Sequence, residues 1–239
     1  LHEPYRRQRQ MCIRDRYIRS QNDLIMLEGE IQYFHLAYEG QIKVVNYGGT
    51  TTCNDKEGEP ATISINKADS VVLYISVATS YQLQDNVFLL PNAEKFKGNA
   101  LPHDKVAKCI RTATKKGYER LRQEHIADYQ RLFNRVNFSL TDHIPSITTD
   151  KLLYQYRNGK QDPYLEELFF QYGRYLLIAS SRPGSLPANL QGAWNQYEYA
   201  PWSGGYWHNV NVQMNYWPAF NTNLAESFIP YMEYNEAFR

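Results

Sequence analysis

Residues 180–195 read SSRPGSLPANLQGAWN, and residues 209–219 read NVNVQMNYWPA. Proline and glycine recur throughout residues 183–222, so we expect irregular backbone there rather than long helices or strands. A long irregular segment inside a compact domain is usually functional or disordered, and the many aromatic residues argue against disorder. The sequence therefore predicts a functional loop region over residues 183–222.

All four tryptophans of the chain lie in this region. They are Trp194, Trp202, Trp207 and Trp217, and Asn and Gln residues are interleaved with them. Aromatic faces stack on the C–H faces of sugars, and amides offer both a donor and an acceptor to hydroxyl groups. Such a pocket suits a neutral polyol better than a charged ligand. The same composition also fits a hydrophobic core whose Asn side chains cap loops, and composition leaves both interpretations open.

Helical patterns flank the loop region on both sides. Asp162-Pro163 is a capping residue followed by proline at the first helical position, and Arg182-Pro183 stops the pattern. We therefore expect a helix from Pro163 to about Ser180. A final helix is expected to begin at Asn223-Leu224-Ala225-Glu226, which has the spacing of a capping box.

The residues before the loop region change character near position 101. Apolar residues recur at three- to four-residue steps from Asp104 to Val136, which predicts a long amphipathic helical segment that Gly117 interrupts. Residues 30–90 show strand patterns instead. Among them, Val71–Val77 is rich in β-branched residues and apolar on both faces, so we expect a buried strand there. Short strands separated by turns favour a sandwich.

Several motifs resemble the signature of glycoside hydrolase family 95. They are QYGRYLLI at residues 171–178, the two runs quoted above, and Pro201-Trp202 between them, in the family's order. A weaker likeness extends back through residues 128–133 to residues 78–81. The resemblance implies that the chain is an internal fragment of a bacterial enzyme with an N-terminal β-sandwich, a helical linker and an (α/α)6 barrel.

On this basis we expect a mixed multidomain fold, with a partial β-sandwich, a helical linker and the first helices of an (α/α)6 barrel. The expected bounds are 17–102 for the end of the sandwich, 103–145 for the linker and 146–239 for the truncated catalytic domain. Residues 1–16 are interpreted as the translation of a sequencing adapter, because Met11-Cys12-Ile13-Arg14-Asp15 resembles an adapter end. A basic arm for nucleic acid or membrane is the alternative.

The resemblance also implies an activity, the inverting hydrolysis of terminal α-L-fucosides, or related α-L-galactosides, of oligosaccharides. In the family, two asparagines that match Asn209 and Asn211 hold the attacking water, while a glutamate acid and an aspartate lie further downstream. Inversion needs an acid at the leaving oxygen and an activated water on the opposite side. We expect the two asparagines to point the same way on an extended loop. We also expect the fragment alone to be inactive.

Sugar-binding residues are expected around these asparagines. They are Trp194, Asn195, Trp202, Trp207 and His208. Gly204–His208 and Phe220 depart from the common family pattern close to the expected sugar pocket. His208 fits either a contact to a sugar hydroxyl or a packed loop histidine. Two other functions stay open: an inactive carbohydrate-binding protein of the same fold, and a structural module in which the aromatic cluster is only core.

The remaining composition gives no support to other classes of protein. The net charge is +1, which offers no bulk attraction for nucleic acid or an anionic membrane, and no segment has the apolar length of a transmembrane helix. Cys12, Cys53 and Cys109 lack the spacing of a zinc site or a disulfide framework. We therefore expect an oligosaccharide partner and no cofactor, metal, nucleic acid or membrane. The sequence indicates neither oligomeric state nor compartment.

Overall fold

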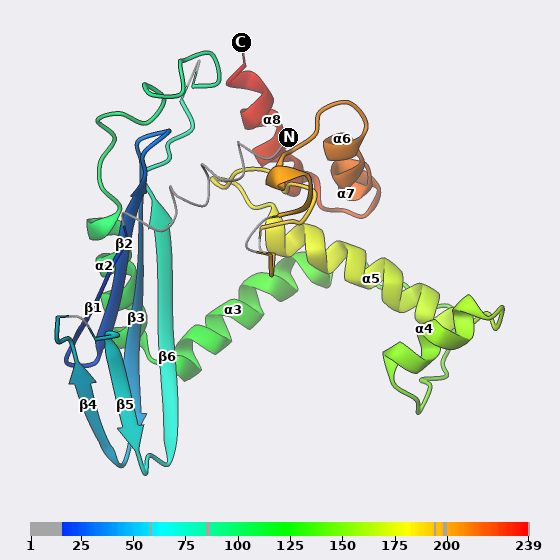
Figure 1. The fold of residues 1–239 in the computed structure, drawn as a ribbon. Coiled ribbons are helices and arrows are strands. Elements are labelled where there is room, and N and C mark those ends of the chain that lie inside the picture. The colour runs from blue at the N-terminus through cyan, green and yellow to red at the C-terminus, as the bar shows by residue number, and fades with distance from the viewer. Residues whose placement is uncertain (1–15, 58, 85–86, 194, 198–199, 239) are drawn as a thin grey trace. The chain divides into compact units, whose positions relative to one another are not determined.

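The computed structural model describes residues 16–57, 59–84, 87–193, 195–197 and 200–238 (Figure 1). The expected adapter segment therefore lies outside the described residues, except for Arg16. The described residues up to position 124 form one compact unit, and those from 125 to 237 form a second. A sheet region comes first and helices follow, which confirms the coarse order of elements that the sequence predicts.

The first unit is built on a four-stranded antiparallel sheet with the order β1-β2-β3-β6. Its strands are β1 (Arg16–Gln21), β2 (Leu24–Ile31), β3 (Leu36–Tyr47) and β6 (Ser70–Thr79). A two-stranded hairpin joins β4 (Thr50–Asn54) to β5 (Thr62–Asn66). Strand β1 and most of β2 precede the region where the sequence pattern predicts strands, so the sheet begins earlier than expected.

Helix α2 (His103–Lys116) packs on one face of this sheet, against β3 and β6. Its buried residues Val106 and Ile110 are four positions apart, which is the period of one helix face. Gly117 follows the helix with a φ of 77°, a value that favours glycine, and α3 (Tyr118–Phe133) begins at the next residue. The predicted interruption at Gly117 is therefore confirmed.

Strand β6 exists as predicted, but the expectation that it is buried on both faces is wrong. Tyr74 is buried, whereas Val71, Leu73, Ile75 and Val77 have exposed fractions between 41% and 62%. These four alternate along the strand and so share one face. The strand is also the last in its sheet, with α2 packed against the sheet. No described element buries the apolar row, so apolar composition on both faces does not mean burial on both faces here.

The second unit is helical and wraps around one core. Its elements after α3 are α4 (Thr149–Arg157), α5 (Pro163–Ser180), η1 (Pro201–Gly204), α6 (Asn211–Tyr216), α7 (Pro218–Asn221), η2 (Ala225–Phe228) and α8 (Ile229–Glu236). Residues of α3, α5, the loop after α5, α6 and α7 meet in a buried cluster. It contains Leu132, Leu177, Ile178, Ala188, Val212, Tyr216, Ala219 and Leu224.

The ends of these helices test the capping predictions. Asp162 Oδ1 accepts a hydrogen bond from the backbone N–H of Leu165 at 3.1 Å, and α5 ends at Ser180, so the predicted bounds of this helix are confirmed. The capping box predicted at Asn223–Glu226 is wrong. A short 3-10 turn begins at Ala225, and the Glu226 carboxylate binds Arg135 instead of its own helix start. Arg135, which is far away in sequence, therefore binds this carboxylate in place of the backbone at the helix start.

Candidate functional site

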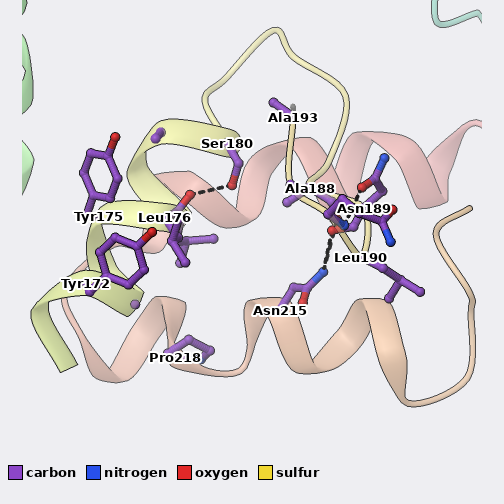
Figure 2. Close-up of a pocket in the computed structure, with 15 residues that line it drawn as sticks. Tyr172, Tyr175, Leu176, Ser180, Ala188, Asn189, Leu190, Ala193, Asn215 and Pro218 are labelled. Carbon is purple, nitrogen blue, oxygen red and sulfur yellow. Dashed lines mark hydrogen bonds between the residues drawn. The ribbon is translucent and has the colours of Figure 1, made fainter. Parts of the chain in front are cut away.

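A hollow of about 570 Å³ opens in the second unit, between α5, the loop at residues 188–193 and α6 (Figure 2). Tyr172, Gly173, Tyr175 and Leu176 line it from α5, and Pro218 lines it from the start of α7. The loop and α6 contribute Asn189, Leu190, Gln191 and Asn215. No charged side chain is among the residues that line it. Its volume falls within the usual range for small-molecule sites.

The 188–193 loop is fixed to α6 by amide hydrogen bonds. Asn215 Nδ2 donates to the carbonyls of Ala188 at 3.3 Å and Asn189 at 3.2 Å, as Figure 2 shows. Asn189 Oδ1 accepts from the Gln191 N–H at 2.8 Å, and the Gly192 N–H donates to the Asn189 carbonyl at 3.1 Å. Gly192 has a φ of 76°, which closes this turn at no steric cost. The amides lining the hollow are therefore held before any ligand arrives.

Hydrogen bonds through two buried hydroxyl groups also hold the 188–193 loop in place. The Ala188 N–H donates to the Tyr216 hydroxyl at 2.7 Å, and that hydroxyl lies 2.8 Å from Ser181 Oγ. Ser181 Oγ donates its one hydrogen to the Ser227 carbonyl at 2.8 Å, so Tyr216 is the donor to Ser181. Burial raises the pKa of the Tyr216 phenol, which keeps this hydrogen in place.

Arg174, in the QYGR motif, binds the end of α3. Its side chain is buried and its guanidinium donates to the carbonyls of Leu132 at 3.1 Å, Phe133 at 2.9 Å and Thr222 at 3.3 Å. The last carbonyls of a helix have no partner within the helix, and five fixed N–H donors suit them. This motif residue therefore has a structural role.

Two ion pairs join segments of this unit that are far apart in sequence, and the first of them links two motif residues. Arg182 Nη2 contacts both carboxylate oxygens of Asp128, at 2.7 and 2.8 Å. Arg135 forms a two-bond pair with Glu226, at 2.7 and 2.8 Å. These hydrogen bonds lower the pKa of Glu226 and raise that of Arg135. The weaker likeness at residues 128–133 and the SSRPG run are thus joined by a direct contact.

The two asparagines predicted to hold the catalytic water lie in a turn and not in an extended loop. Asn209 has a φ of 72°, Val210 has helical angles, and Asn211 is the first residue of α6. The expectation of an extended loop is therefore wrong. Both side chains are exposed, and neither makes a hydrogen bond with any described residue.

Two of the three predicted sugar-binding tryptophans, Trp202 and Trp207, are among the described residues. Trp202 and Trp207 are exposed by 65% and 50%, and Trp207 Nε1 donates to the Trp202 carbonyl at 3.0 Å. Asn195 is exposed, and its Oδ1 accepts from the Tyr197 N–H at 2.9 Å. Trp194 lies outside the described residues. Among the described residues, neither Asn195, Trp202 nor Trp207 lines the hollow of Figure 2.

The imidazole ring of His208 packs against the ring of Tyr234. Its ring stacks on Tyr234 with centroids 5.4 Å apart and an interplanar angle of 9°, and its Nε2 lies 3.0 Å from the Tyr234 hydroxyl. Tyr234 is buried on α8. This contact orients the residue immediately before Asn209, which fits the packed-histidine alternative. A contact from His208 to a sugar stays a prediction.

Sequence reasoning did not single out the residues that line the hollow as site residues. Asn189, Gln191 and Asn215 belong to the amide-rich pattern, but nothing in that pattern separates them from other amides. Gly173 carried a clearer signal, because glycine in the interior of a helix is unfavourable and calls for an explanation. Proximity between α5 and α6 is a tertiary fact that local patterns do not contain.

Comparisons with known proteins agree with the class that these motifs and helices indicate, a glycoside hydrolase. Residues 117–239 match the glycosyl hydrolase family 95 catalytic domain. The chain is 36% identical over 206 residues to alpha-L-fucosidase 2 of Arabidopsis thaliana, covering 82% of this chain and 22% of that protein. It is 37% identical over 205 residues to probable alpha-fucosidase A of Aspergillus niger, covering 83% and 25%.

The chain belongs to glycoside hydrolase family 95. It spans about a quarter of the length of these relatives. A further relative of similar identity is probable alpha-fucosidase A of Aspergillus oryzae. These three relatives come from a plant and from fungi, so they give no support to the bacterial origin that we expected.

Among the described residues, no helix combines the length and apolar character that crossing a bilayer requires. The described residues also contain no group of three or more His, Cys, Asp or Glu side chains arranged to hold a metal ion.

Proposed function

We propose that this chain is the sugar-holding part of an inverting exo-glycosidase that removes terminal α-L-fucose, or related α-L-galactose, from oligosaccharides. The observation that carries the proposal is the turn at Asn209 and Asn211, whose side chains are exposed and make no hydrogen bond with a described residue, while Trp202 and Trp207 just before it in sequence are also exposed. Family membership and the printed names of the relatives, which are alpha-fucosidases, support the same class of substrate.

The chemistry assigns different tasks to amides and carboxylates. An inverting reaction needs an acid that protonates the leaving oxygen and a base that activates water on the opposite face of the sugar. The amide oxygens of Asn209 and Asn211 accept hydrogen bonds from that water and fix its position. An amide is too weak a base to take the proton alone, so we place the acid and the activating carboxylate in the parent protein beyond this chain. The 239-residue chain alone is then inactive.

The same proposal extends to the domains. We assign residues 17–102 to the end of a β-sandwich, residues 103–145 to a helical linker and residues 146–239 to the first helices of an (α/α)6 barrel. The exposed apolar row on β6 supports the sandwich, because a second layer over that row buries it. The capped helix α5 and the core formed with α6 and α7 support a helical catalytic domain.

Replacement of Asn211 by alanine in the full-length protein tests the function. We expect Asn211→Ala to lower kcat for an α-L-fucoside by at least about a hundredfold, since a misplaced water loses the advantage of a fixed orientation. The melting temperature should stay unchanged, because the Asn211 side chain is exposed and makes no hydrogen bond with a described residue.

A matched control is Asn134→Ala, since Asn134 is also exposed and its side chain makes no hydrogen bond with a described residue. This control should turn over substrate at the wild-type rate. Near-normal turnover by Asn211→Ala would remove the proposed role of the turn. Detection of the product anomer by NMR checks the inversion separately.

A further inference from the structure

A second hollow, of about 540 Å³, lies in the first unit between α2 and strands β2 and β3, and we call it the α2 crevice. Its volume falls within the usual range for small-molecule sites. Helix α2 packs against β3 and β6, while Leu24 and Met26 of β2 stay only half-buried. Asn209 and Asn211 belong to the second unit, so the crevice is a candidate site separate from the proposed reaction centre.

The floor of the α2 crevice is a patch on one face of the sheet. Leu24 and Met26 are two residues apart in β2 and therefore share a face. Their partners across the strand pair are Lys43 and Gln41 of β3, which lie on the same face. Apolar surface from the helix is added by Ala107 and Ile110. This floor suits a ligand with an aliphatic body better than a fully polar one.

Basic side chains also line the α2 crevice. Lys43 lines it from β3, and its Nζ binds the Asp23 carboxylate. His103 lines it from the start of α2, and its Nδ1 lies 3.0 Å from Glu39 Oε1. No acidic side chain is among the described residues that line the crevice. The wall therefore combines positive groups with apolar surface.

Arg111 and Lys115 are the lining cations that have no hydrogen bond or ion pair with a described residue. Both are exposed, and they are four residues apart on α2, so their side chains are neighbours. Like charges at this spacing destabilise a helix. The helix dipole favours a cation in the last turn, which accounts for Lys115, but Arg111 precedes that turn. An anion bound between the two side chains offsets their repulsion.

We propose that the α2 crevice binds a small amphipathic carboxylate, an organic anion whose carboxyl group is attached to an aliphatic body. The carboxylate accepts hydrogen bonds from Lys115 and from Arg111, whose planar guanidinium matches two carboxylate oxygens. The aliphatic body covers Leu24, Met26 and Ala107, and its burial supplies affinity that an inorganic anion lacks. Binding is non-covalent and does not depend on the proposed hydrolysis of fucosides.

Isothermal titration calorimetry of the full-length protein with three probes tests this proposal. The probes are octanoate, which has both features, 1-octanol, which lacks the charge, and acetate, which lacks the aliphatic body. We expect octanoate to bind at least about tenfold more tightly than either of the others, because a charged hydrogen bond and a buried chain each contribute that much. Octanoate that does not bind, or that binds no better than 1-octanol or acetate, overturns the proposal.

Removal of one charge on α2 locates the site. Arg111→Gln keeps part of the side-chain length without the charge, so octanoate should bind about tenfold more weakly while 1-octanol binds as before. Lys108→Gln is the matched control, because Lys108 is an exposed cation of the same helix that does not line the crevice. This control should bind octanoate like the wild type. Wild-type affinity of Arg111→Gln for octanoate would place binding elsewhere and overturn the assignment.

Thermal unfolding separates loss of the ligand contact from loss of the fold. Without ligand, Arg111→Gln should melt at or above the wild-type temperature, because its repulsion with Lys115 is gone. Octanoate should raise the melting temperature of the wild type and of Lys108→Gln by the same amount, and that of Arg111→Gln by less. Equal increases in all three proteins would contradict a site at the α2 crevice.

Discussion

The hydroxyl of Tyr216 connects three segments of the second unit. It accepts from the Ala188 N–H of the loop and donates to Ser181 at the end of α5, which in turn donates to the Ser227 carbonyl. Each group is buried, so none can exchange its partner for water. The donor and acceptor roles in this series of hydrogen bonds follow because each hydroxyl group has a single hydrogen to donate.

Removal of that single oxygen should therefore destabilise the unit. We expect Tyr216→Phe to lower the free energy of unfolding by about 1–3 kcal/mol, because the Ala188 N–H loses its acceptor and Ser181 Oγ loses its donor. The aromatic ring and its packing against Tyr231 remain. Urea denaturation measures the change. Tyr175→Phe is the matched control, since the Tyr175 ring is exposed and its hydroxyl makes no hydrogen bond with a described residue, and it should unfold like the wild type.

Helix α5 shows how local chemistry sets an element. Asp162 caps its first turn, Pro163 occupies a position where no N–H is needed, and the helix ends at Ser180 before Arg182-Pro183. Since α5 provides one wall of the hollow, its start and length also position Tyr172, Gly173 and Leu176.

Loss of the cap should weaken this helix measurably. We expect Asp162→Ala to cost about 1 kcal/mol of unfolding free energy, because the Leu165 N–H loses its acceptor. Asp162→Asn keeps a side-chain oxygen and should recover most of that loss. Thermal unfolding followed by circular dichroism compares the two, and equal melting temperatures for both variants would contradict a capping role.

The elements that the sequence predicts correctly are those whose signals are local. The bounds of α5 and the break at Gly117 follow from residues within a few positions of each helix end. Glu226 was assigned wrongly because its partner, Arg135, is 91 residues away. The burial of β6 was wrong for a related reason, since burial depends on what covers a face and not on its composition alone.

The candidate site was predictable only as a region. An Asn-x-Asn pattern is compatible with both an extended segment and a turn, and the left-handed φ of Asn209 is not marked by a neighbouring glycine. The loop that contains Gln191 was expected to be functional. That Gln191 and Gly173 line the same hollow depends on how α5, this loop and α6 pack together, which no local pattern reports.

At the scale of the whole molecule, one charged pair makes stability depend on pH. The hydrogen bonds from Arg135 hold the pKa of Glu226 below its ordinary value of 4.5. The folded pKa is depressed, so the pair's stabilisation is fully present above the unfolded pKa and is lost as the pH falls through the folded value. The partly exposed pair is screened by solvent, which keeps this stabilisation modest.

Comparison with Glu226→Gln isolates this effect. The wild type should be more stable than the variant at about pH 6, and the difference should shrink as the pH falls to about 3. Urea denaturation at each pH measures it. A difference that stays constant across this range would show that the carboxylate charge contributes nothing.

The empty space beside Gly173 has a practical consequence for anyone who handles this protein. A thiol placed there by Gly173→Cys can carry a small environment-sensitive dye at the mouth of the hollow, with no neighbouring atom to displace. Cys53 and Cys109 are exposed and would compete for the label, so they and Cys12 must first be exchanged for serine. A change in the emission of the dye then reports whether the hollow is occupied. The absence of a side chain at position 173 thus offers an attachment point for an optical sensor.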